Sequence, residues 1–219
     1  MEIVKNLWQV GGGDLTASED AAIYLVRLGK QAALIDAGCG NAHNRLTENI
    51  AAVLPVDVRI THLFITHCHY DHVGGAASVK KEYGCKLVSH RLDAAYLESG
   101  DSGVTAASWY GAVMQPLEMD HIIEGRKESF ELGNGAITAY HCPGHSPGSL
   151  VYRVKLENQK ILFGQDVHGP LDPSLLSNRE DYKRSLKFML GLEADILCEG
   201  HFGIYRGKDN INRFIKSFL

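Results

Sequence analysis

The stretch Thr66-His67-Cys68-His69-Tyr70-Asp71-His72-Val73-Gly74-Gly75 places three imidazoles and one carboxylate within six residues. It follows the apolar run 62–66, which is typical of a buried strand. His67 and His69, two residues apart, can point to the same side of an extended loop, whereas Asp71 and His72 at the following turn project in a different direction. One short loop can therefore supply ligands to two neighbouring metal ions. The paired glycines indicate a helix packed tightly against this loop.

Three further ligand candidates follow in order along the chain. His145 lies in the stiff turn Cys142-Pro143-Gly144-His145-Ser146-Pro147-Gly148-Ser149, Asp166 ends the apolar run 160–163, and His201 follows Ile196-Leu197-Cys198. Each terminates a predicted strand and has glycine beside it, so all three can meet at one edge of a sheet. Taken singly, each fits an ordinary turn residue equally well.

Apolar runs bounded by turn signals predict strands over 7–10, 22–28, 32–36, 62–66, 86–89, 129–132, 136–141, 149–154 and 160–163. A helix is predicted over 73–83, closed by Gly84, and two more carry single apolar stripes through 182–190 and 211–219. Residues 91–124 read as irregular with short helical stretches. Interleaved strands and helices favour stacked sheets with helices outside them.

The composition is that of a globular protein, with 219 residues, 45% of them hydrophobic and 22% charged. A net charge of −4 disfavours a nucleic-acid partner, and no apolar run approaches the length of a membrane span. Five scattered cysteines in no CxxC pattern predict free thiols. Together with the lack of a recognisable signal peptide, they indicate a cytoplasmic protein. A homodimer is compatible with these features, as is a small-molecule substrate.

As an ordered set, HxHxDH at 67–72, His145, Asp166 and His201, with Leu34-Ile35-Asp36-Ala37-Gly38 upstream, resembles the metallo-β-lactamase superfamily over nearly the whole chain. The resemblance implies one α+β domain over 1–219, an αββα sandwich of two stacked mixed sheets flanked by helices. It further implies two divalent metal ions, with zinc the first expectation and iron or mixed metals the alternatives. His67, His69 and His145 would hold one ion, Asp71, His72 and His201 the other, and Asp166 would bridge them. Asp36 would support a ligand or simply cap a strand.

These residue types suit hydrolysis, because paired cations can generate hydroxide from water near pH 7 and polarise a scissile bond. Asp71 could orient the hydroxide and pass a proton to the leaving group, which removes the need for a serine nucleophile of the GxSxG type. The leading hypothesis is cleavage of a small ester, thioester or lactone. The alternatives are a mononuclear iron oxygenase similar to the persulfide dioxygenases, a phosphodiesterase, and a non-enzymatic scaffold.

Within the superfamily the chain resembles glyoxalase II most closely, but only eighteen residues follow His201. The expectation is therefore a relative without the C-terminal helical domain that binds glutathione there. Residues 91–124 are expected to form a cap or insert beside the active site, in which Trp109, Tyr110 and Met114 either line the substrate cleft or pack beneath the cap. Cys68 is not expected to be a ligand. His168 is interpreted as a loop residue rather than one that touches substrate, and His43, His62, His90, His121 and His141 as structural or surface residues.

Overall fold

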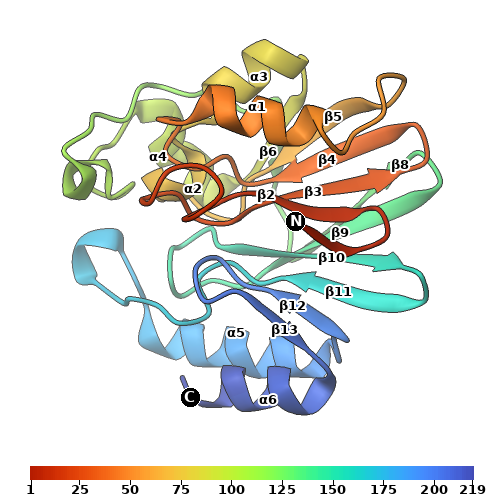
Figure 1. The fold of residues 1–219 in the computed structure, drawn as a ribbon. Coiled ribbons are helices and arrows are strands. Elements are labelled where there is room, and N and C mark those ends of the chain that lie inside the picture. Colours follow the sequence, from red (N-terminus) through yellow and green to blue (C-terminus); the bar gives the residue numbers. More distant parts are fainter.

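The first half of the chain forms a seven-stranded mixed sheet in the computed structural model, which describes residues 1–219 (Figure 1). Its strands lie in sequence order: β1 (Glu2–Val4), β2 (Leu7–Gly11), β3 (Ile23–Leu28), β4 (Gln31–Ile35), β5 (Arg59–Phe64), β6 (Lys86–His90) and β7 (His121–Ile123). Strands β1 to β4 pair antiparallel, and β4 to β7 pair parallel. The loop that follows β5 carries the HxHxDH segment.

The second half forms a six-stranded mixed sheet that stacks on the first. Its order is β13 (Ile204–Arg206), β12 (Ile196–Cys198), β11 (Gln159–Phe163), β10 (Leu150–Leu156), β9 (Gly135–His141) and β8 (Lys127–Leu132). Only β11 and β12 pair parallel. His145, Asp166 and His201 follow β9, β11 and β12.

Six α-helices cover the outer faces of the two sheets or connect their strands (Figure 1). On the first sheet these are α1 (His43–Ala51), α2 (Tyr70–Val73), α3 (Ala76–Tyr83) and α4 (Arg91–Ser99); on the second they are α5 (Arg179–Gly191) and α6 (Lys208–Lys216). Short 3-10 turns lie at Ala107–Tyr110 (η1) and Pro173–Leu175 (η2). None of these helices combines the length and the hydropathy that a membrane-spanning segment requires.

Strand periodicity explains the layering, because successive side chains point to opposite faces of a sheet. Along β4, Ala32 and Leu34 join the apolar cluster beneath α1, α3 and α4, whereas Ala33 and Ile35 join the cluster between the sheets. A third cluster packs α5 and α6 on the second sheet. A strand buried on both faces reads as one continuous apolar run, which is why these strands were visible in the sequence. The predicted αββα sandwich is confirmed.

Several details differ from the sequence-based expectations. The helix predicted over 73–83 is wrong at its start, because Gly74 and Gly75 separate α2 from α3. A Cβ on Gly75 would collide with the carbonyl of Ala37, so the chain passes too close here for a continuous helix with ordinary side chains. Helix α1 was not predicted, since it buries only Leu46 and Ile50. Within residues 91–124, the expected short helical stretches are present as α4 and η1, but the edge strand β7 was not predicted.

Candidate metal centre

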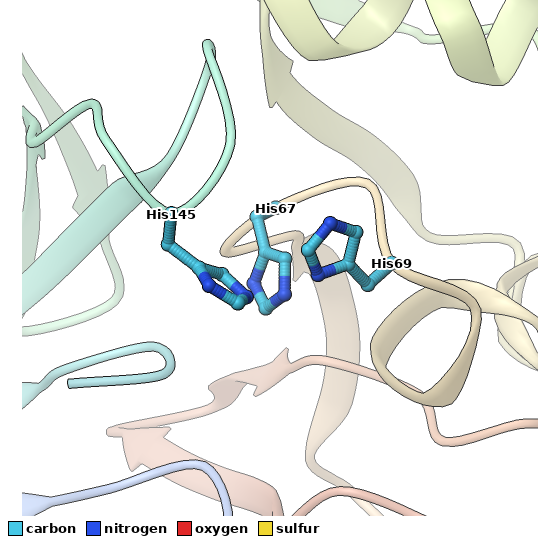
Figure 2. Close-up of side chains that lie close together, drawn as sticks. All are labelled: His67, His69 and His145. Atoms are coloured by element: carbon cyan, nitrogen blue, oxygen red, sulfur yellow. The ribbon is translucent and has the colours of Figure 1, made fainter. Parts of the chain in front are cut away.

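Three histidine rings from two loops converge on one buried point (Figure 2). His67 and His69 come from the loop between β5 and α2, and His145 from the loop between β9 and β10. Their ring centroids lie 4.5 to 4.7 Å apart, each pair nearly perpendicular. Their Nε2 atoms are buried and form no hydrogen bond, although a buried polar atom without a partner is costly. Three converging orphan nitrogens fit a metal ion.

The outer nitrogens of His67 and His145 have partners, whereas the inner nitrogens are free. His145 Nδ1 lies 2.9 Å from the carbonyl oxygen of Pro170, and His67 Nδ1 lies 3.0 Å from Thr66 Oγ1. Donation from Nδ1 to the carbonyl leaves the lone pair of His145 on Nε2, directed toward the other two rings. The surroundings therefore fix the orientation that a ligand needs.

A second donor set adjoins the first. Asp71, His72 and His201 place one ligand atom each within 4.8 Å of one another. His201 Nε2 lies 3.1 Å from Asp71 Oδ2 and 3.3 Å from His72 Nε2. On its other side, His72 Nδ1 donates to Asp36 Oδ2 at 2.7 Å, and the same carboxylate oxygen also accepts from the Thr66 hydroxyl.

Asp166 lies between the two donor sets. One carboxylate oxygen is 3.0 Å from His72 Nε2, and the other is 3.4 Å from His145 Nε2 and 3.5 Å from His201 Nε2. The loop that carries His201 passes so close to it that a Cβ on Gly200 would collide with Asp166 Oδ1. This contact requires glycine at position 200.

Charge in the centre is unbalanced without cations. The buried carboxylates Asp36, Asp71 and Asp166 form ion pairs with histidines and with no lysine or arginine. Burial opposes a charged imidazole, but the three carboxylates outweigh it and raise the pKa of His72. Against the same opposition, Asp166 and Asp71 raise the pKa of His201 to about 9. Divalent cations would supply the missing positive charge.

In the three-histidine set, burial lowers the pKa values of two imidazoles instead of being outweighed by carboxylates. It lowers the pKa values of His67 and His69 well below the usual range for histidine, and the neighbouring imidazoles add to this effect. Both rings are therefore neutral at physiological pH, which is the protonation state that binds metal.

Residues 19–201 match the description "Metallo-beta-lactamase superfamily". The chain belongs to this superfamily. Among curated proteins, it is 28% identical over 148 residues to a "Probable metallo-hydrolase" of Methanocaldococcus jannaschii, covering 66% of this chain and 68% of that protein. It is 26% identical over 228 residues to an "Acyl-coenzyme A thioesterase" of Gallus gallus, covering 91% of this chain and 78% of that one.

Solved structures share the fold across the whole chain. One is a class B3 di-zinc metallo-beta-lactamase from an Alaskan soil metagenome, with a TM-score of 0.77, 24% identity and coverage of 99% of this chain and 88% of that one. This likeness concerns the fold, and the superfamily membership makes the chain an enzyme of the metallo-hydrolase type. The narrower resemblance to glyoxalase II stays a prediction.

All seven ligand candidates lie in this centre of the metallo-β-lactamase fold. Cys68 is fully buried within the apolar cluster on the far side of its loop, and all five cysteines are free thiols. The five histidines interpreted as structural belong to none of the donor clusters; His90 and His141, for example, stack on each other at 3.8 Å.

Other side chains around the centre were not identified from the sequence. Glu199 is fully buried and its Oε1 lies 2.8 Å from His168 Nδ1, a pairing that the position of Glu199 two residues before His201 could have suggested. Asp93 on α4 is also fully buried and contacts two ligand loops, but nothing in its local sequence indicates this. Met114 packs in the core, whereas Trp109 and Tyr110 are exposed.

Proposed function

We propose that this enzyme is a dinuclear hydrolase that cleaves a small ester, thioester or lactone. The observation that carries the proposal is the pair of adjoining donor sets with Asp166 between them, since one set alone would serve a single ion. Imidazole and carboxylate donors suit zinc, with iron or a mixed pair as alternatives. When bound, two such cations supply Lewis acidity and a water-derived nucleophile near neutral pH.

The residues of the centre have separate roles in holding the cations and in proton transfer. His67, His69 and His145 would hold one cation, Asp71, His72 and His201 the other, and Asp166 would contact both. Asp71 lies at the edge of the centre, where its carboxylate can orient the attacking water and carry a proton to the leaving group. Asp36 fixes the ring of His72 by its 2.7 Å contact with Nδ1.

The surroundings of His201 support a small substrate. A cavity of about 400 Å³ adjoins His201, and its lining combines polar side chains such as Asp14, Ser18 and Asp20 with the apolar Leu15. Volumes of this order accommodate small ligands. Phe202, beside His201, and Trp109 expose more than half of their surfaces. Partial burial and the charge of Asp71 raise the pKa of Tyr110, so its hydroxyl remains a hydrogen-bond donor near the centre.

The test combines metal content with a substrate screen. Protein purified without added metal should contain about two ions per chain, and it should turn over at least one compound in a panel of esters, thioesters, lactones and phosphodiesters. The thioesterase name of the Gallus gallus relative supports including acyl thioesters. H43Q, which changes a histidine outside the donor clusters, is the matched control and should keep both the metal and the activity.

Two outcomes would overturn this proposal. A single iron per chain, together with oxygen consumption on a persulfide, would instead assign a mononuclear dioxygenase. Turnover restricted to phosphodiesters would replace the substrate class. The complete Asp71–His72–His201 set favours the dinuclear hydrolase over both alternatives.

A further inference from the structure

Asp93 is a fully buried carboxylate that no lysine or arginine neutralises. It lies in the first turn of α4 and accepts hydrogen bonds from two different loops. Its Oδ2 accepts from the Cys68 backbone N–H at 2.9 Å and from the Ser146 hydroxyl at 2.6 Å, and its Oδ1 accepts from the Gly148 backbone N–H at 2.5 Å.

These bonds join the two loops that carry the three-histidine set. Cys68 lies between His67 and His69, and Ser146 follows His145 directly. The carboxylate thus fixes the separation of the two loops at positions adjacent to all three imidazoles. Hydrogen bonds to an ionised acceptor are about twice as strong as neutral ones, so one side chain can hold both loops.

Glu199 makes the corresponding connection on the other side of the centre. Its Oε1 lies 2.8 Å from His168 Nδ1, in the loop that follows Asp166. Its Oε2 accepts at 2.7 Å from the backbone N–H groups of both His201 and Phe202. This fully buried carboxylate therefore links the loop of Asp166 to the loop of His201.

We propose that Asp93 and Glu199 are positioning residues, each of which supports one half of the dinuclear centre. Asp93 supports the set His67, His69 and His145, and Glu199 supports His201 and its contact with Asp166. The proposal rests on the dinuclear function proposed above.

Each carboxylate is assigned to one half of the centre because other contacts hold the ligands of the other half. Asp71 and His72 follow His67 and His69 closely in the chain but lie in helix α2. In addition, the Asp36 carboxylate accepts a hydrogen bond from the ring of His72. Their positions therefore depend less on Asp93. No bond of Glu199 reaches the loops of His67 or His145.

The test measures each metal site separately. In H201N the three-histidine set remains, and in H145N the other set remains. Chelator-stripped protein of each background is titrated with Co²⁺ and followed by its visible absorption, with and without D93N or E199Q. We expect D93N to weaken Co²⁺ binding about tenfold or more in H201N, and E199Q to do so in H145N. The crossed combinations should change affinity by less than about threefold.

D120N is the matched control, because Asp120 also accepts a backbone N–H, that of Leu87 at 2.9 Å, but contacts neither ligand loop. It should leave both affinities unchanged. Equal losses in both backgrounds, or no loss in either, would overturn the assignment. If D93N or E199Q does not fold, S146A and H168A each remove one bond of the same carboxylates and decide the question in the same way.

Amide hydrogen exchange of the metal-free chain gives a second readout that needs no bound ion. D93N should accelerate exchange in 67–69 and 145–149 but not in 199–202, and E199Q should do the reverse. A wild-type chain that binds fewer than two Co²⁺ ions would contradict the proposed function. Two ions in the wild type with uniform exchange in both variants would contradict the positioning roles alone.

Discussion

Acidification should destabilise this protein through His90, the residue that ends β6 and caps α4. Its ring stacks on His141 at 3.8 Å, Nδ1 accepts from the Leu92 backbone N–H at 3.4 Å, and Nε2 is buried without a partner. Burial, and then the positive charges of His141 and Arg91, lower the pKa of His90 to about 4. Protonation would also place a cation at a helix N-terminus, which is unfavourable.

The sign and size of the effect follow from linkage. The unfolded chain, with a histidine pKa of about 6.5, binds more protons than the folded chain between pH 6.5 and pH 4. The contribution of His90 is therefore complete above pH 6.5 and is lost as the pH falls through this window. A difference of about 2.5 pKa units corresponds to about 3 kcal/mol, and because solvent screens part of this interaction, about 2 kcal/mol is lost by pH 4.5.

Urea unfolding of the metal-free wild type and of H90N at pH 7.5 and pH 4.5 measures the contribution of His90 to the free energy of unfolding. Asparagine keeps a side-chain acceptor at the N-cap of α4, so the helix should persist. Groups common to both chains cancel in the comparison. The free energy of unfolding of H90N should fall by about 2 kcal/mol less than that of the wild type. Equal losses in the two chains would refute the reasoning.

Three further predictions concern the centre and its loops. D166A should lower metal content and activity together, because Asp166 faces both donor sets, and unchanged metal stoichiometry on elemental analysis would contradict its bridging role. C68S should keep the wild-type metal content, since this side chain packs in the apolar cluster; a lost ion would assign the thiol to the centre. G75A should lower the free energy of unfolding by about 2 kcal/mol, because its Cβ collides with backbone, whereas G191A, with open space around it, should not. The urea midpoints of G75A and G191A measure this difference, and equal stability of the two variants would argue against the close approach at Gly75.

Several features of the fold could be predicted because they depend on local patterns in short segments of the sequence. The strands buried on both faces appear as continuous apolar runs, and α5 and α6 appear as single apolar stripes. Helix α1 buries only two side chains and has no side-chain cap, so its local signal was weak. The three residues of β7 become a strand only by pairing with β6, which no local pattern records.

By itself, the sequence determined the donor types and their order, because each ligand lies at a strand end and the spacing within HxHxDH is local. Only the tertiary structure decided how the donors are held. Asp93 reaches loops separated from it by 25 and 53 positions, and Glu199 reaches His168 across 31. Such contacts depend on how the two sheets and their connecting loops pack, and packing over these separations leaves no periodicity in the chain.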